Sequence, residues 1–237
     1  MSDYIHTLMN IVDEAYKDQS LRTSINVVLS HIVVYNPPPA SRNAYYRGYH
    51  DNLIRQDNEE ESLNNVLRYM QNLHNRMHFD IGVFLTRKYF GPAAGYAPVA
   101  GMCRPGKSGA LVKDNGFNSA FVIAHEIGHT LGMRHDGVDN ECVDSSSHGS
   151  IMAPIVKSKI NLFKWSRCSK QELMYNIHKF QCIHERPVQT NMQLEFERSN
   201  SAYKADGRRY DGERWNRDDQ CHSIYGPQWK TCASLGK

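Results

Sequence analysis

Residues 125–136 read HEIGHTLGMRHD and carry histidine and glutamate at spacings suited to binding a metal ion. His125 and His129 are four residues apart, so in a helix both imidazoles project from one face, about one turn apart. Two nitrogen ligands placed in this way can bind one zinc ion at about 2.0–2.1 Å each. Glu126 is offset by about 100° around the helix axis and can reach a water molecule beside the metal.

Gly132 stands where this helix must end, because glycine adopts the left-handed conformation at little cost. The chain can then turn back and present His135 as a third nitrogen ligand. Three protein ligands leave one coordination position for water, which is typical of catalytic rather than structural zinc. A full HExxHxxGxxH match is expected by chance on the order of once in ten thousand such chains. The motif predicts a zinc site in which Glu126 takes a proton from water and returns it to the leaving amine.

Met152 lies downstream, in HGSIMAPIV (148–156). A methionine beside isoleucine and proline is more often a core residue, but after an extended zinc motif it fits the Met-turn of the metzincins. The nine other histidines lack the motif's spacing and are interpreted as surface or core residues: His6, His31, His50, His74, His78, His148, His178, His184 and His222.

The elements that must position this motif follow from apolar periodicity. Helices are expected over 3–18, 57–76 and 119–131, the last with Asn118 or Ser119 as its N-cap, and strands buried on both faces over 25–35 and 81–86. Residues 91–109, rich in glycine and proline, are expected to be irregular or to form edge structure. This order predicts an α/β fold with a mostly parallel sheet.

Composition limits the function classes. The 237 residues carry a net charge of only +3 and show no basic stripe, so a dedicated nucleic-acid binder is not expected. The sequence contains no run of about 18 apolar residues, so no membrane-spanning helix is expected. The first ten residues do not resemble a signal peptide. Six cysteines nevertheless point to an oxidising compartment.

Four stretches resemble the secreted ADAMTS metalloproteinases, which are metzincins of the reprolysin type, and most resemble the branch that includes the procollagen N-proteinases. They are GYAPVAGMC (95–103), NSAFVIAHEIGHTLGMRHDG (118–137), GSIMAPIV (149–156) and WSRCSKQEL (165–173). The resemblance covers nearly all of residues 1–183. It implies a metzincin fold and a secreted, monomeric zinc endopeptidase acting on extracellular matrix proteins, with collagen precursors as the first substrate class.

The resemblance also implies a domain organisation. Residues 1–185 correspond to a catalytic domain that lacks its first strand, expected about 25 residues upstream of Asp3 after a signal peptide and a prodomain. Residues 186–219 are a polar linker, and 220–237 begin a disintegrin-like module. The absence of a signal peptide is then expected to reflect truncation.

Cysteine pairing is likewise implied by the resemblance, which joins Cys103 to Cys182 and Cys142 to Cys168. A further family bridge is lost from both of its ends, at the positions of Leu67 and Gly109. Cys221 and Cys232 match the first cysteines of the disintegrin-like module, and they either bridge each other or stay free.

Two aspartates have roles implied by the family. Asp136 matches a buried aspartate that supports the local fold. Asp80 matches a calcium ligand, but Glu185 stands near a position where aspartate is usual, so any calcium site is expected to be weakened. Asp80 could equally be a carboxylate at the start of a strand.

Two alternatives to a matrix endopeptidase stay open. One is a folded but catalytically weak or inactive matrix-binding fragment of such a protease. The other is a zinc hydrolase outside the metzincins, against which the Met-turn segment and the spacing from Gly132 to His135 both count.

Overall fold

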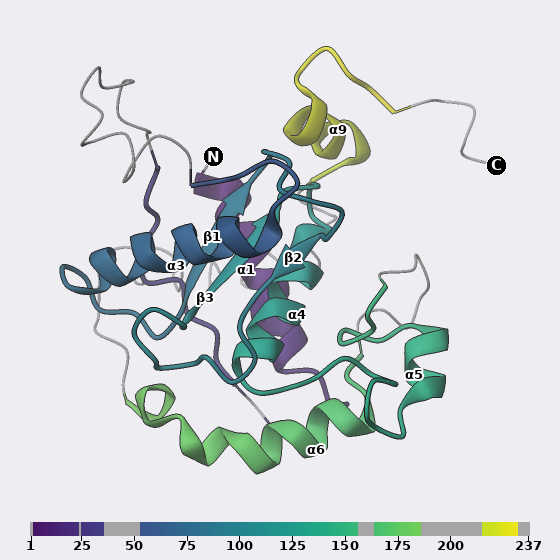
Figure 1. Ribbon diagram of the computed structural model, residues 1–237. Helices are drawn as coiled ribbons and strands as arrows, with labels where there is room; N and C mark the ends of the chain where they lie inside the picture. The colour runs from purple at the N-terminus through teal and green to yellow at the C-terminus, as the bar shows by residue number, and fades with distance from the viewer. Residues whose placement is uncertain (1, 24, 36–52, 156–163, 186–214, 232–237) are drawn as a thin grey trace.

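The computed structural model describes residues 2–23, 25–35, 53–155, 164–185 and 215–231, in which helices surround a small sheet (Figure 1). The first elements are α1 (Ser2–Tyr16), α3 (Glu59–His74), β1 (Gly82–Thr86), β2 (Gly95–Tyr96), β3 (Gly109–Lys113) and α4 (Ser119–Thr130). They are followed by α5 (Val143–His148), α6 (Arg167–Asn176), the 3-10 helices Ile177–Lys179 and Gln181–His184, and α9 (Arg217–Tyr225). No helix in this part of the chain is long and apolar enough to cross a membrane.

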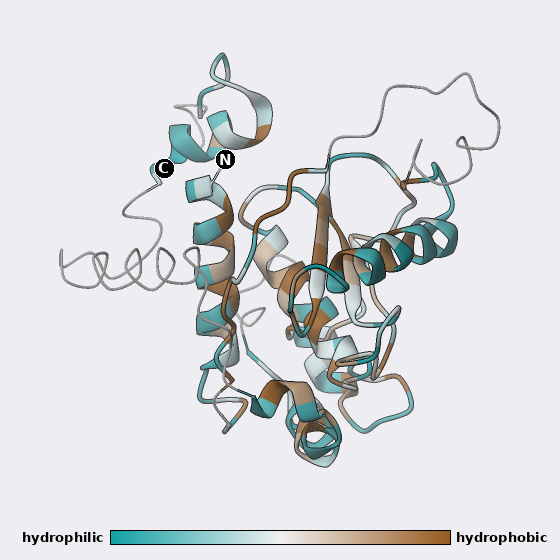
Figure 2. Cartoon of the chain, turned by 90° about the vertical axis from the view of Figure 1, so that its left-hand side faces the viewer, coloured by the Kyte–Doolittle hydropathy of each residue, from teal (hydrophilic) through white to brown (hydrophobic). Residues whose placement is uncertain are grey.

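The two helices expected before the first strand are confirmed as α1 and α3. The hydrophobic side of α1 faces the body of the domain, and its hydrophilic side faces outward (Figure 2). At the start of α3, the Asn58 side chain accepts a hydrogen bond of 2.9 Å from the Glu61 backbone N–H. Three glutamates in the first turn, residues 59–61, interact favourably with the helix dipole.

The sheet is mixed, with strand order β1-β3-β2. β1 runs parallel to β3 with Gly82 opposite Gly109, whereas β2 is antiparallel to β3 with Gly95 opposite Val112. The expected strand at 81–86 is thus confirmed as β1, although its residues are only partly buried rather than buried on both faces. The glycine- and proline-rich segment supplies the short edge strand β2. The strand β3 was not expected from the sequence, because its few apolar residues directly follow that irregular segment.

The strand expected over 25–35 is wrong: in the structure, residues 26–35 belong to no β-ladder. The apolar, β-branched composition of this segment favours extended backbone, but a strand also needs a neighbour to accept and donate its hydrogen bonds. Among the described residues, the three-stranded sheet does not reach it. Val33 and Val34 are accordingly 44% and 55% exposed rather than buried.

Helices cover both faces of the sheet, and β3 shows how the two layers divide. Ala110 and Val112 pack in one hydrophobic cluster with residues of α1 and α4. Leu111 points the other way, into a second cluster formed with α3. This alternation is what the two-residue repeat of a strand produces. The helix α4 thus packs against a strand whose first four residues are buried.

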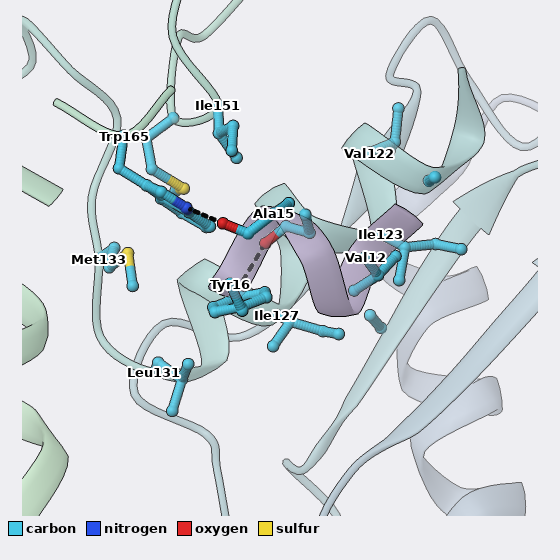
Figure 3. Close-up of a cluster of buried hydrophobic side chains, with 14 of the residues drawn as sticks. Val12, Ala15, Tyr16, Val122, Ile123, Ile127, Leu131, Met133, Ile151 and Trp165 are labelled. Carbon is cyan, nitrogen blue, oxygen red and sulfur yellow. Dashed lines mark hydrogen bonds between the residues drawn. The ribbon is translucent and has the colours of Figure 1, made fainter. Parts of the chain in front are cut away.

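Two hydrogen bonds from aromatic side chains connect α1 to its surroundings. The Tyr16 hydroxyl donates to the Ala124 carbonyl oxygen of α4 at 2.8 Å, and the Trp165 indole N–H donates to the Ala15 carbonyl oxygen at 2.7 Å. The two rings pack with their centroids 4.8 Å apart (Figure 3). The first bond joins α1 to α4, and the second joins α1 to the segment that leads into α6.

The structure contains both disulfides that the family resemblance implies, Cys103–Cys182 and Cys142–Cys168. At the positions of the missing family bridge, a Cβ atom on Gly109 would lie 2.8 Å from Leu67 Cδ2. The two positions are therefore in contact, and an aliphatic side chain fills the space between them.

The C-terminal segment packs on the domain through Trp215, whose indole N–H donates to Thr7 Oγ1 at 3.0 Å. The Arg87 guanidinium donates to the carbonyl oxygens of Ser223 and Ile224 at the end of α9. The helix α9 begins inside the segment expected to be a linker. Cys221 is free, and Cys232 lies outside the described residues.

Replacing Tyr16 by phenylalanine should destabilise the domain. Tyr16→Phe removes only the hydroxyl, leaving one buried carbonyl lone pair without its donor, which costs about 1 kcal/mol. For a domain of this size, a cost of this order lowers the Tm by about 2–4 °C. Differential scanning calorimetry measures the shift. Tyr175→Phe, at a site 69% exposed, is the matched control and should leave Tm unchanged; equal shifts for both variants would contradict the assigned role of Tyr16.

Candidate metal centre

Helix α4 positions the first two candidate ligands. His125 and His129 lie one turn apart on its buried face, and their ring centroids are 4.6 Å apart. The helix is apolar on almost every side because the sheet and α1 enclose it. Asn118 occupies the N-cap position, as expected, but its side chain makes no capping bond. The Ser119 hydroxyl accepts a hydrogen bond from the Asn115 N–H and donates one to the Lys113 carbonyl.

The chain leaves α4 through a turn at Gly132, which has a φ of 87°. This is the left-handed conformation expected from the sequence. A Cβ atom here would also lie 2.6 Å from the Asn176 amide nitrogen, so glycine is required by packing as well. The turn brings His135 back to the helix, with its Nε2 atom 3.1 Å from His125 Nε2 and 3.0 Å from His129 Nε2.

Backbone carbonyls orient two of the three rings through the Nδ1 atom, on the side away from the converging Nε2 atoms. His125 Nδ1 lies 2.6 Å from the Ile151 carbonyl oxygen, and His129 Nδ1 lies 2.8 Å from that of Met133. A carbonyl only accepts, so each Nδ1 must carry the proton, and each Nε2 is left with a lone pair directed into the site.

Converging lone pairs repel one another unless a cation lies between them. Neighbouring nitrogens in a tetrahedral zinc site are about 3.3 Å apart, given Zn–N distances of about 2.0–2.1 Å. The observed Nε2 separations are close to this value, and the three histidines form a group whose ligand atoms all lie within 4.8 Å of one another. The three residues predicted as ligands therefore fit a single zinc ion.

Burial also keeps these imidazoles neutral. It lowers the pKa of His125 to about 3 and that of His129 to about 4, and it lowers the pKa of His135 as well. Only the neutral ring can donate a lone pair to a metal. His125 and His129 consequently stay neutral, and able to bind a metal ion, well below neutral pH.

Glu126 lies beside the three histidines and is 4% exposed. Its Oε2 atom has no hydrogen-bond partner among the described residues, and burial raises the pKa of the carboxyl to about 8. A buried carboxyl without a partner is costly unless a cation or a reacting group supplies one. The side chain runs against β2, where a Cβ atom on Gly95 would lie 2.5 Å from Glu126 Oε1.

Asp136 and Met152 are buried residues of the segments that pack next to the histidines. The buried Asp136 carboxylate accepts hydrogen bonds from the Ser150 and Ser166 hydroxyls, the latter at 2.5 Å, and its backbone N–H donates to the Met152 carbonyl oxygen at 2.9 Å. Met152 is fully buried, and a Cβ atom on Gly128 would lie 2.7 Å from its sulfur. The methionine thus packs directly on the helix that carries the ligands.

Asp80 does not belong to this centre. It lines a separate cavity of about 290 Å³ together with His74, His78 and Glu185. Burial raises the pKa of Asp80, an effect that His78 partly offsets and Glu185 reinforces. Across the described ranges, the histidine triad is the only group of three or more histidine, cysteine or acidic residues whose ligand atoms lie within metal-binding distance of one another.

Three contributors to the centre were not predicted from the sequence. The carbonyl groups of Ile151 and Met133 orient the rings, and Gly95 leaves room for Glu126. Backbone carbonyls carry no side-chain signal, so no motif could reveal them. Gly95 does stand in the stretch GYAPVAGMC, and a glycine in an otherwise apolar edge strand indicates close approach by another group.

Comparison with known proteins agrees with this geometry. Residues 1–187 match the family model described as Reprolysin (M12B) family zinc metalloprotease. The chain is 39% identical over 242 residues to human "A disintegrin and metalloproteinase with thrombospondin motifs 3" and 40% identical over 242 residues to the human protein with thrombospondin motifs 14. It is 46% identical over 192 residues to the Bos taurus protein with thrombospondin motifs 2.

These alignments include 99%, 99% and 78% of the chain, respectively. The chain spans only 18% of the length of each human relative and 15% of the bovine one.

Zinc affinity should depend only weakly on pH between 7.5 and 6.0. A histidine with an ordinary pKa of about 6.5 loses about fourfold in availability at pH 6.0, or about sixteenfold for two. Because the lowered pKa values of His125 and His129 keep both rings neutral at pH 6.0, we expect less than a threefold change. Competition against a chelator of known affinity at each pH measures it. A drop of tenfold or more would show that the rings are not held as described.

Proposed function

The chain belongs to the reprolysin (M12B) family of zinc metalloproteases, and we propose that it hydrolyses internal peptide bonds of extracellular matrix proteins. The observation that carries the proposal is the convergence of three neutral imidazoles beside the buried Glu126 carboxyl, whose Oε2 atom has no hydrogen-bond partner among the described residues. Structural zinc sites use four protein ligands, whereas this arrangement leaves a position for water and substrate.

We assign the general-base role to Glu126. Zinc bound by His125, His129 and His135 would supply Lewis acidity toward the scissile carbonyl and would favour the ionised form of the neighbouring carboxyl. Glu126 then accepts a proton from the attacking water and donates it to the nitrogen of the leaving amine. Its burial between α4 and β2 keeps competing solvent away from the carboxylate.

The roles proposed for Gly132, Asp136 and Met152 are structural. Gly132 permits the turn that returns His135 to the helix. The Asp136 carboxylate holds the segment after that turn through two serine hydroxyls. Met152 is the proposed Met-turn residue, and its support is that it packs on Gly128 between the two helical ligands.

We also propose a substrate class and a compartment. Similarity of residues 95–173 to the procollagen N-proteinase branch supports procollagen as the first substrate class to test, and two disulfides support a secreted protein. The division into catalytic domain (1–185), linker (186–219) and module start (220–237) stays a prediction, as do a monomeric state and calcium binding at Asp80.

Glu126→Gln should abolish most peptide cleavage while zinc stays bound. The amide keeps the size of the side chain but cannot accept the proton, so we expect kcat to fall by about 10²–10⁴-fold. Assays on a fluorogenic peptide and on purified procollagen, with zinc content measured in parallel, test this. Glu60→Gln, on the exposed first turn of α3, is the control and should leave kcat unchanged.

Three outcomes bear on the proposal. Cleavage by Glu126→Gln at the unmodified rate would overturn the general-base assignment. Cleavage that a zinc chelator does not reduce would overturn zinc dependence. Absence of cleavage by the unmodified chain, with or without chelator, would favour an inactive matrix-binding fragment.

Gly95→Ala should impair catalysis by displacing Glu126. The backbone of Gly95 tolerates alanine, since its φ lies outside the left-handed region, but the added Cβ would lie within 3 Å of three atoms of the carboxyl-bearing side chain. We expect kcat to fall at least tenfold with an altered pH profile, and KM and bound zinc to change little. Gly82→Ala, whose Cβ meets only the flexible Met70 side chain, is the matched control. Equal effects of both substitutions would contradict a positioning role.

A further inference from the structure

The turn between the second and third ligands is supported by two helices in succession. As far as Met133 it bonds back to α4, because the Met133 N–H donates to the Gly128 carbonyl oxygen at 2.9 Å. The next N–H, that of Arg134, donates instead to Glu172 Oε2 of α6 at 2.7 Å. The support of the chain thus passes from α4 to α6 between the two ligands.

The Glu172 carboxylate is itself held in place. Its other oxygen, Oε1, accepts a hydrogen bond from Arg134 Nε at 2.8 Å and lies 2.8 Å from Nη2 of the same guanidinium. The Glu172 side chain is only 16% exposed. Hydrogen bonds to an ionised acceptor are stronger than those between neutral groups, and the planar guanidinium restricts the carboxylate in angle as well as in distance. The guanidinium therefore keeps Oε2 directed at the backbone N–H.

A second residue of α6 binds the other side of the turn. Asn176 follows Glu172 by four residues, so both side chains project from one face of the helix. The Asn176 side-chain amide donates to the Gly132 carbonyl oxygen at 3.2 Å. Gly132 and Arg134, the residues on either side of Met133, are thus both bonded to α6.

Met133 is the residue that these bonds hold. Its carbonyl oxygen accepts a hydrogen bond from His129 Nδ1 at 2.8 Å, and its side chain is fully buried. An acceptor at Nδ1 selects the tautomer whose Nε2 lone pair can bind a metal ion. His135 follows two residues later, so a displacement of the turn would move the acceptor of the second ligand and the third ligand together.

The helix α6 is firmly connected to the surroundings of the centre. Cys168, in its first turn, forms the disulfide with Cys142, and Leu173 is fully buried. The N-cap residue of α6, Ser166, donates to Asp136 Oδ1 at 2.5 Å. These contacts keep α6 in a fixed position relative to the segment that carries the third ligand.

We propose that Glu172 is a positioning residue of the metal centre. Its carboxylate, together with the Asn176 amide, fixes the turn, keeps the Met133 carbonyl on His129 and brings His135 to the other two ligands. The inference rests on the proposed function, in which the three histidines bind zinc. Glu172 acts through the backbone of the turn.

Nuclear magnetic resonance of the metal-free chain tests this role without any assay of cleavage. Two-bond ¹H–¹⁵N spectra report which nitrogen of each imidazole carries the proton. In the unmodified chain, we expect His125 and His129 to be protonated at Nδ1. Glu172→Ala should shift the His129 signals toward exchange between the two tautomers. His125, whose acceptor is the Ile151 carbonyl, should keep its Nδ1 proton.

The rate at which zinc is transferred to an excess of chelator gives a second readout. Loss of a group that orients a ligating histidine commonly lowers metal affinity by about 10–100-fold, so release from Glu172→Ala should be at least about tenfold faster. Glu172→Gln should release zinc at close to the unmodified rate, because its amide oxygen can still accept the Arg134 N–H. This rescue by the conservative variant would not follow from the loss of an ion pair alone.

Glu141→Ala is the matched control, because Glu141 forms an exposed ion pair with Arg167 of the same helix. It should change neither readout. Unchanged His129 signals and zinc release in Glu172→Ala would overturn the positioning role. Equal disturbance of His125 and His129 would also overturn it, since that result indicates general loosening of the fold.

Asn176→Ala provides the same test if Glu172→Ala does not fold. It should disturb the His129 signals and leave those of His125 in place, and undisturbed His129 signals would overturn the role assigned to α6. Neither readout involves a substrate. A chain that cleaves no peptide would therefore count against the proposed function and not against the positioning role.

Discussion

Two hydrogen bonds behind the histidine rings are the constraint on which the metal centre depends. The Ile151 and Met133 carbonyls accept the Nδ1 protons of His125 and His129, and this fixes both the tautomer and the direction of each lone pair. Without these two hydrogen bonds, the buried imidazoles could rotate or change tautomer, and their Nε2 lone pairs would no longer all point into the site. Their loops must therefore be held as firmly as the ligands themselves.

The rest of the domain supplies that support from three sides. The strand β3 packs on α4, the Tyr16 hydroxyl of α1 donates a hydrogen bond to the same helix, and the Asp136 carboxylate accepts hydrogen bonds that hold the segment after the third ligand. One disulfide joins Cys142, just before α5, to Cys168 in α6, and the other joins Cys103 to Cys182 in the 3-10 helix Gln181–His184. The domain thus combines a small sheet with covalent and polar restraints concentrated around the centre.

Local chemistry was predictable from the sequence, and long-range pairing was not. The spacing of His125, His129 and His135 with Gly132 sufficed to predict the centre, because each element of the motif acts within one helix and one turn. The segment 25–35 was predicted wrongly, because strand formation needs a partner that composition cannot locate. The Ile151 and Met133 carbonyls that orient the rings could not be predicted for a related reason. They are backbone groups, which every residue type carries.

The most direct test of the account is the identity of the metal and its ligands in the purified protein. Zinc analysis combined with X-ray absorption at the zinc edge counts the ions and the atoms around them. The account predicts one zinc per chain, bound by three imidazole nitrogens at about 2.0–2.1 Å and one oxygen. A sulfur ligand, a fourth imidazole, or a chain that binds no zinc would contradict it.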